Sequence, residues 1–138
     1  MRRILVTGGS GFIGSHSCLV LLERGYEILV IDSEINSSRK TLEKVKSIIY
    51  SSSTDLNNNL QFIKGDLRDL DFLKNVFSDS KLKCKSIEAV IHFAGLKAVG
   101  ESIMHPLLYW DVNVSGTINL LKVMESYECR TIVFSSSA

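Results

Sequence analysis

The chain has 138 residues, of which 45% are apolar and 22% charged, and its formal net charge is +1. This composition supports one packed domain rather than disorder, and without a basic block it gives no electrostatic support for binding to nucleic acid or to a membrane surface. The sequence has no signal-peptide pattern and no apolar run of membrane-spanning length, and its three scattered cysteines form no CxxC pair, so it predicts a cytoplasmic protein without a metal site or a disulfide framework.

A glycine-rich turn follows the first apolar run of the chain. Residues 3–6 have the pattern of a short β-strand, and residues 15–22 have the pattern of a helix. The glycines between them fit G-x-G-x-x-G at Gly9, Gly11 and Gly14, and G-x-x-G-x-x-G at Gly8, Gly11 and Gly14. Such glycines allow a sharp turn, a close approach of the main chain to a pyrophosphate, and phosphate binding at the helix N-terminus. The segment therefore predicts a dinucleotide site, although a lone match of this kind also occurs in ordinary tight turns.

Asp32 ends the second apolar run, residues 27–31, where the dinucleotide fingerprint has its acidic residue. A carboxylate there accepts hydrogen bonds from both hydroxyls of the adenosine ribose and repels a 2′-phosphate, which favours NAD over NADP. The alternative interpretation is that Asp32 caps a turn or helix after the strand. Downstream, Asn36-Ser37-Ser38 is a capping sequence for a helix over about residues 39–50. The expected apolar face of that helix is Leu42, Val45, Ile48 and Ile49.

The third predicted strand covers residues 60–64 and is followed by an amphipathic helix with Asp69 near its start. The apolar face of this helix is expected to include Leu70, Leu73, Val76 and Phe77. Asp66 has two compatible interpretations: it caps this helix, or it reaches the adenine amino group of a bound dinucleotide.

Residues 87–93 form the fourth predicted strand, and they run into a loop over residues 94–102. This strand is expected to lie beside the first one across the switch point of the sheet, where ligands bind. Lys97 is the only cation of the loop, and the alternative to a ligand contact is a solvated surface lysine. His92 lies inside an apolar run, which favours a packed core histidine over an acid–base group.

Pro106 is expected to open a long helix that reaches about Tyr127. Its proposed apolar stripe is Leu107, Val114, Leu121 and Met124. Gly116 in mid-helix predicts a close contact with another element, and a partly buried Asn113 needs hydrogen-bond partners. Residues 131–134 form the fifth strand. The alternation of five strands with four helical segments predicts an α/β fold with a doubly wound parallel sheet in the order 3-2-1-4-5.

Four segments of the chain resemble the extended short-chain dehydrogenase/reductases and, within them, the UDP-hexose 4-epimerases: residues 6–16, 65–68, 91–102 and 134–138. The first segment is common to many sugar-nucleotide enzymes, whereas the last two are more particular to the epimerases. The resemblance implies that residues 1–138 are a truncated Rossmann-type NAD-binding domain. It also implies tightly bound NAD, a tyrosine that takes the proton of the hexose 4-hydroxyl, hydride transfer from C4, and a 4-keto sugar that turns over before the hydride returns.

The resemblance assigns cofactor contacts to the glycine turn and to the segments after the second, third and fourth strands: Gly8, Gly11, Phe12, Ile13, Gly14, Asp32, Asn36, Ser37, Asp66, Leu67, Phe93, Ala94, Gly95, Lys97 and Asn113. Phe12 and Ile13 are implied to cover the pyrophosphate. Lys97 is implied to lie near the nicotinamide, and Ser137 to be the catalytic serine that hydrogen-bonds the sugar hydroxyl. Ser33 departs from the asparagine that is common in the family, which weakens at most one contact on the ribose side.

The tyrosine of the family's Tyr-x-x-x-Lys motif has no counterpart, because none of the four tyrosines is followed by lysine four residues later. We therefore expect an N-terminal fragment without the substrate domain, which binds NAD but does not convert UDP-hexose alone. The bare edge of the last strand and the long helix predict self-association, such as a homodimer. The alternatives are a nucleotide-sugar 4,6-dehydratase or decarboxylase of the same family, and a non-catalytic NAD-binding module.

Overall fold

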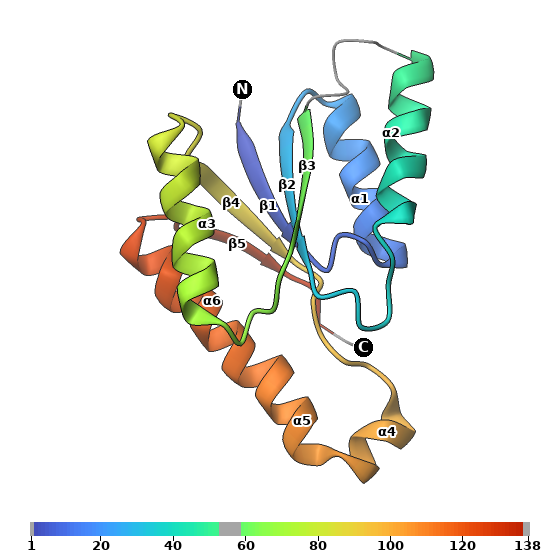
Figure 1. Cartoon of the computed structure of the whole chain (residues 1–138), viewed down its shortest axis with the longest axis vertical. Coiled ribbons are helices and arrows are strands. Elements are labelled where there is room, and N and C mark those ends of the chain that lie inside the picture. Colours follow the sequence, from blue (N-terminus) through green and yellow to red (C-terminus); the bar gives the residue numbers. More distant parts are fainter. Residues whose placement is uncertain (1, 53–58, 137–138) are drawn as a thin grey trace.

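The computed structural model describes residues 2–52 and 59–136, which form a parallel five-stranded sheet with helices on both faces (Figure 1). The strands are β1 (Arg3–Thr7), β2 (Glu27–Asp32), β3 (Leu60–Lys64), β4 (Ile87–His92) and β5 (Thr131–Phe134). The helices are α1 (Phe12–Glu23), α2 (Lys40–Ser52), α3 (Leu70–Leu82), α4 (Val99–Met104), α5 (Pro106–Trp110), the π-helical segment η2 (Asp111–Ser115) and α6 (Gly116–Ser126). The order across the sheet is β3-β2-β1-β4-β5, so the predicted doubly wound α/β fold and its strand order are confirmed.

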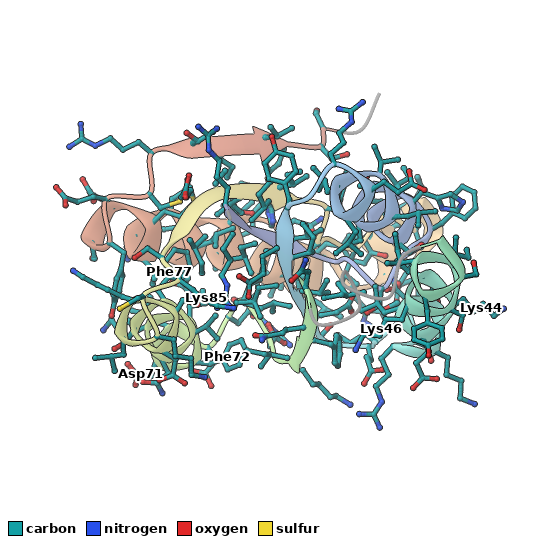
Figure 2. The ribbon with its side chains drawn as sticks, turned by 90° about the horizontal axis from the view of Figure 1, so that it is seen from above. Lys44, Lys46, Asp71, Phe72, Phe77 and Lys85 are labelled. Atoms are coloured by element: carbon teal, nitrogen blue, oxygen red, sulfur yellow. The ribbon has the colours of Figure 1, made fainter. Side chains whose placement is uncertain are left out.

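The central strand β1 and its neighbour β2 are buried along their whole length because helices cover both faces of the sheet. Side chains alternate between the faces: Val6 and Val30 lie in the core under α1 and α2, whereas Leu5 and Leu29 lie in the core under α3 and α6. Figure 2, viewed from above, shows side chains filling both layers, with Phe77 of α3 on the second side. The continuous apolar runs in the sequence therefore correspond to strands of a sheet that is covered on both faces.

The segment between β4 and α6 differs from its prediction in three respects. Residues 99–104 form the short helix α4 rather than a loop, so the chain has more helical segments than the four predicted. The long helix after Pro106 contains a π-helical turn, which changes the phase of the side chains that follow it. The predicted apolar stripe is wrong at Leu121, which follows this turn, and at Leu107, which precedes it, because both side chains are exposed. The buried face of α6 consists of Gly116, Leu120, Val123 and Met124.

The predicted apolar face of α2 is correct at three of its positions. Leu42, Val45 and Ile49 are buried against the sheet, whereas Ile48 is about half exposed at 49%. The face of α2 that contacts the core is therefore narrower than its sequence periodicity indicates.

None of the described helices is long and apolar enough to cross a membrane. The three cysteines are free thiols, with Cys18 and Cys129 buried and Cys84 exposed. Burial raises the pKa of Cys18 to about 12, so this thiol stays protonated inside the core under α1.

Candidate functional site

A cavity of about 340 Å³ opens at the carboxyl ends of β1 to β4, around the switch point of the sheet. Every residue for which the resemblance implies a cofactor contact lines this cavity, with the exception of Asn113. The predicted catalytic Ser137 lies outside the described residues. The cavity is further lined by residues that the sequence reasoning did not select: Ile31, Ser33, Ile35, Gly65, Leu96 and Val112. All six are chain neighbours of selected residues, so their place could have been inferred from adjacency.

The glycine turn forms one wall of the cavity, and its shape depends on the absence of side chains. Gly8 has a φ of +69°, and a Cβ there would lie 2.7 Å from Ala94 N, so the turn touches the backbone after β4. A Cβ on Gly14 would lie 2.4 Å from Gly8 O, so α1 packs directly against the turn. Gly11 is the N-cap of α1 and supplies no side-chain cap. The amide groups of the first helical turn are therefore free to bind an anion.

Asp32 is held in the cavity wall at the end of β2, where its side chain is only slightly exposed. The Ser10 N–H donates to Oδ2 at 3.0 Å, and the Glu34 N–H and the Ser37 hydroxyl donate to Oδ1 at 2.9 and 2.8 Å. Asp32 thus stabilises the turn that follows β2, which agrees with the alternative interpretation that it caps a turn after its strand. Asp32 also lines the cavity, so the two interpretations of this residue are compatible.

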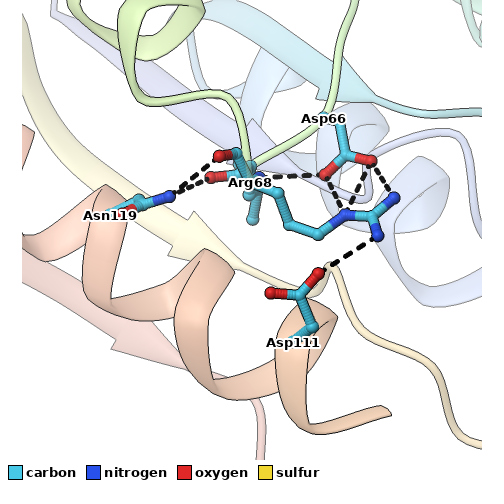
Figure 3. Close-up of polar contacts among 5 residues, drawn as sticks. Asp66, Arg68, Asp111 and Asn119 are labelled. Atoms are coloured by element: carbon cyan, nitrogen blue, oxygen red, sulfur yellow. Dashed lines mark hydrogen bonds and ion pairs between the residues drawn. The ribbon is translucent and has the colours of Figure 1, made fainter. Parts of the chain in front are cut away.

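Asp66 lies on the β3–α3 loop and forms an ion pair with Arg68 (Figure 3). The Arg68 guanidinium donates to both carboxylate oxygens of Asp66, with Nη2 2.7 Å from Oδ2, and these hydrogen bonds lower the pKa of Asp66 below its usual range. Asp69, whose side chain accepts a hydrogen bond from Phe72 N at 2.9 Å, caps α3. The prediction that Asp66 caps this helix is therefore wrong, because the helix starts one turn later. Asp66 remains available to the cavity as a fixed carboxylate.

The long helix anchors the same loop at three points. Arg68 Nη1 also donates to Asp111 Oδ2 of η2 at 3.3 Å, and the Asn119 amide of α6 donates to the carbonyl oxygens of Leu67 and Arg68 at 3.2 and 3.1 Å (Figure 3). A Cβ on Gly116 would lie 3.3 Å from Leu67 Cβ, which is the close contact predicted for this glycine. The β3–α3 loop is therefore positioned by residues that lie more than 40 positions away in the sequence.

The β4–α4 loop forms the opposite wall of the cavity and carries Phe93, Ala94, Gly95, Leu96 and Lys97. Asn113 of η2 has the partners that its sequence position required: its Oδ1 accepts from Leu96 N at 2.8 Å and its Nδ2 donates to Leu96 O at 2.9 Å. The Asn113 side chain, which was expected to contact the cofactor, thus forms its hydrogen bonds with the backbone of the cavity wall instead. Lys97 is exposed and lines the cavity.

Tyr109 of α5 connects this wall to α4. Its hydroxyl donates to Glu101 Oε2 at 2.7 Å and accepts from Ala98 N at 3.1 Å. Burial and the neighbouring Glu101 carboxylate together raise the pKa of Tyr109. Tyr109 therefore remains a neutral hydrogen-bonding group that fixes the residue after Lys97.

His92 is a packed core histidine, as its sequence environment indicated. It is 2% exposed and its ring lies between the hydroxyls of Thr7 and Thr117, at 2.6 Å from Nδ1 and 2.9 Å from Nε2. Burial lowers the pKa of His92 to about 4, so the ring is neutral near neutral pH.

Two comparisons of the sequence with known proteins find matches over nearly the whole chain. The family model described as GDP-mannose 4,6 dehydratase matches residues 5–138. UDP-glucose 4-epimerase 2 of Arabidopsis thaliana is 50% identical over 137 residues, which is 99% of this chain and 37% of that protein. The chain therefore spans about a third of the length of the curated relatives that it matches.

Solved structures show the same fold over the whole chain. A UDP-glucose 4-epimerase from Stenotrophomonas maltophila, crystallised with NAD and formylated UDP-arabinopyranose, superposes with a TM-score of 0.86 and 38% identity, over 100% of this chain and 38% of that one. The enzyme from Bifidobacterium longum, in complex with NAD⁺ and UDP, has a TM-score of 0.85 and 42% identity, over 99% of this chain and 37% of that one.

Proposed function

The chain belongs to the family described as GDP-mannose 4,6 dehydratase, and from this membership we propose that it is the NAD-binding part of a UDP-glucose 4-epimerase. The relatives that are about half identical to it carry that name, which favours the epimerases over the dehydratases of the same family. The complete enzyme would interconvert UDP-glucose and UDP-galactose. The observation that carries the proposal is a single cavity shared by the glycine turn, Asp32 and the loop with Lys97.

The residues of the cavity fit a bound dinucleotide. The N-terminus of α1 has no side-chain cap and suits a pyrophosphate, and Gly8 leaves no room for a side chain between the glycine turn and the Ala94 backbone. Asp32 would accept hydrogen bonds from the adenosine ribose and disfavour a 2′-phosphate. Asp66 and Leu67 would flank the adenine. These features support NAD, which supplies a reversible hydride acceptor when it is bound.

The chain's own residues would bind and orient the two ends of this cofactor. Phe12 and Ile13, which are 82% and 53% exposed at the mouth of the cavity, would shield the pyrophosphate from water. Phe93, Ala94, Gly95 and Lys97 would lie along the nicotinamide side, with the Lys97 ammonium as the one positive side chain of that wall. Ser137 would hydrogen-bond the sugar hydroxyl, as the resemblance to the epimerases implies.

We also propose a pathway, a cellular location and an oligomeric state for the complete enzyme. A UDP-hexose epimerase belongs to galactose metabolism in the cytoplasm, and the complete enzyme would act on UDP-hexose as a homodimer. Exposed apolar side chains on β5, with Val133 at 57% and Phe134 at 56%, support self-association of this chain. Light scattering at micromolar concentration tests this, and a clean monomer would contradict it.

Calorimetric titration of the 138-residue chain with NAD and with NADP tests the cofactor. We expect NAD to bind more tightly than NADP, and Asp32→Ala to weaken NAD by about tenfold or more and to reduce this preference. Asp71→Ala is the matched control, because the side chain of Asp71 is 89% exposed on α3, away from the cavity. Equal affinity of the wild-type chain and Asp32→Ala for NAD would refute the ribose contact. Assaying the complete gene product for interconversion of UDP-glucose and UDP-galactose tests the activity itself.

A further inference from the structure

A row of hydrogen bonds runs through the core from the end of β1 to the long helix. Ala94 N and Thr7 Oγ1 are 3.4 Å apart, Thr7 Oγ1 and His92 Nδ1 2.6 Å, and His92 Nε2 and Thr117 Oγ1 2.9 Å. The Thr117 hydroxyl continues the row to the carbonyl of Asn113, at 2.7 Å. Thr7 and His92 are almost completely buried. The row therefore links two strands and the helix that covers them.

The protons of this row can be assigned from its ends. The amide of Ala94 can only donate, so Thr7 Oγ1 accepts from it. The carbonyl of Asn113 can only accept, so the single hydroxyl proton of Thr117 is used there. Thr117 Oγ1 must then accept from His92 Nε2–H, and His92 Nδ1 must accept from the Thr7 hydroxyl.

The opposite tautomer, with the His92 proton on Nδ1, would leave a polar group of the row without a hydrogen-bond partner. With the proton on Nδ1, the ring would donate to Thr7 Oγ1, and the Thr7 hydroxyl proton would have no acceptor among the hydrogen bonds of the described residues. A buried hydroxyl without a partner costs free energy. The geometry therefore selects the neutral ring with its proton on Nε2.

Both ends of the row lie at the walls of the cavity. Thr7 precedes Gly8 of the glycine turn, and Ala94 follows β4, so one end holds these two walls against each other. At the other end, Asn113 holds both polar backbone groups of Leu96, which also lines the cavity. No atom of His92 or Thr117 lines the cavity itself.

We propose that His92, as the neutral Nε2–H tautomer, is a positioning residue that couples the long helix to both walls of the cavity at the end where the nicotinamide would bind. This inference rests on the proposed function for the identity of the ligand. The tautomer and the row of hydrogen bonds do not depend on it. His92 acts through Thr7 and Thr117 and has no contact with the ligand.

Substitution of Thr117 tests the coupling without changing the volume of the core. Thr117→Val is close to isosteric and removes the hydroxyl, whereas Thr117→Ser keeps the hydroxyl and is expected to restore the wild-type behaviour. Ser126→Ala is the matched control, because the Ser126 hydroxyl also donates to a carbonyl four residues earlier on α6, at 3.0 Å, but is exposed. Each chain is titrated with NAD and with ADP, which lacks the nicotinamide half.

We expect Thr117→Val to weaken NAD by about tenfold while the affinity for ADP stays within about twofold. Thr117→Ser and Ser126→Ala are expected to bind both ligands like the wild-type chain. In ¹⁵N-labelled wild-type chain near neutral pH, the His92 ring, assigned by its loss in His92→Gln, should show a protonated Nε2 and an unprotonated Nδ1. In Thr117→Val this single tautomer should give way to a mixture.

Three results would overturn the proposal: a protonated Nδ1 in the wild-type chain, an unchanged affinity of Thr117→Val for NAD, or equal losses of NAD and ADP affinity. If the wild-type chain bound neither NAD nor ADP, the assignment of NAD to the cavity would be refuted instead. The ring tautomer in the wild-type and Thr117→Val chains would still decide whether the row of hydrogen bonds exists as assigned.

Discussion

The side-chain amide of Asn113 holds both polar backbone groups of Leu96, accepting from its N–H at 2.8 Å and donating to its carbonyl oxygen at 2.9 Å. The two residues are 17 positions apart, on a helix and on a loop that lines the cavity. A backbone segment that is held at both its donor and its acceptor has little freedom to move. This pair therefore sets the position of the loop that carries Lys97.

Asn113→Asp should loosen that loop. An ionised aspartate can still accept from Leu96 N, but it cannot donate to Leu96 O, and two oxygens then face each other. We expect the free energy of unfolding in urea to fall by about 1–3 kcal/mol and the affinity for NAD to fall with it. Asn75→Asp, at an exposed position of α3, makes the same chemical change away from the cavity and should alter neither quantity. An unchanged affinity for NAD in Asn113→Asp would show that NAD binding does not depend on the hydrogen bonds between Asn113 and Leu96.

Removal of the Arg68 side chain should release Asp66. Arg68→Met keeps the length of the side chain but loses the hydrogen bonds to Asp66 and Asp111, so the pKa of Asp66 should rise toward its ordinary value. Because both side chains are about one-third exposed, the effect on binding is expected to be moderate, about threefold to tenfold weaker for both NAD and AMP. Carboxyl ¹³C shifts report the pKa of Asp66, and Arg24→Met, at an exposed position after α1, serves as the control. A pKa of Asp66 that stays low in Arg68→Met would contradict the assigned cause.

His92 should make the stability of the fold depend on pH in a defined window. The folded ring resists protonation down to a pKa of about 4, whereas a histidine in the unfolded chain titrates near 6.5. Between these values the unfolded state binds more protons, so the free energy of unfolding falls as the pH falls. The stabilisation is fully present above about pH 6.5, and about 2 kcal/mol of it should be lost by pH 5.

The contribution of His92 is isolated by the difference between the wild-type chain and His92→Gln, because carboxylates also titrate at low pH. The difference in the free energy of unfolding, measured by urea denaturation, should shrink as the pH falls from about 7.5 to about 5. His105→Gln, at an exposed histidine, is the control. A difference that is constant over this range would mean that His92 is not held neutral by the fold.

Glu27 should affect stability without affecting the cavity. It lies at the amino end of β2 and forms a buried ion pair with Arg3 and a second pair with Lys85 at 2.9 Å. Burial raises the pKa of Glu27, but hydrogen bonds from Arg3 and Lys85 outweigh this and hold it below its usual range. Glu27→Gln leaves a buried guanidinium without its counter-charge, which should cost about 3 kcal/mol.

The matched control for this substitution is Glu88→Gln, because Glu88 pairs with Arg2 at 3.6 Å on the surface, where both side chains are more than half exposed. That pair should contribute less than about 1 kcal/mol. The affinity for NAD should be unchanged in both variants, since the binding cavity lies at the carboxyl ends of the strands. A loss of NAD affinity in Glu27→Gln would show that the two ends of the sheet are coupled.

Features that depend on near neighbours in the chain were predicted correctly. The resemblance to a known family implied most of the residues that line the cavity, whereas the β-branched runs and the alternation of strands and helices predicted the fold class and the strand order. The reason is that turn geometry, strand propensity and helix capping act over a few residues. Two acidic residues close together in the sequence were not distinguished in this way, since Asp69 and not Asp66 caps α3.

The sequence by itself therefore determined a doubly wound sheet with a crevice expected at its switch point, because the alternation of strands and helices follows from local spacing. Only the tertiary structure decided which polar side chains are held by contacts with distant parts of the chain. The side chain of Asn113 forms a hydrogen bond with the backbone of Leu96. Arg68 donates to Asp111, which is 43 positions away in the sequence. The ring of His92 forms hydrogen bonds with Thr7 of β1 and Thr117 of α6. Such pairs depend on strand register and on the π-helical turn at Asp111–Ser115, which sets the phase of the long helix. These long-range contacts form only when the whole sheet and its covering helices have assembled.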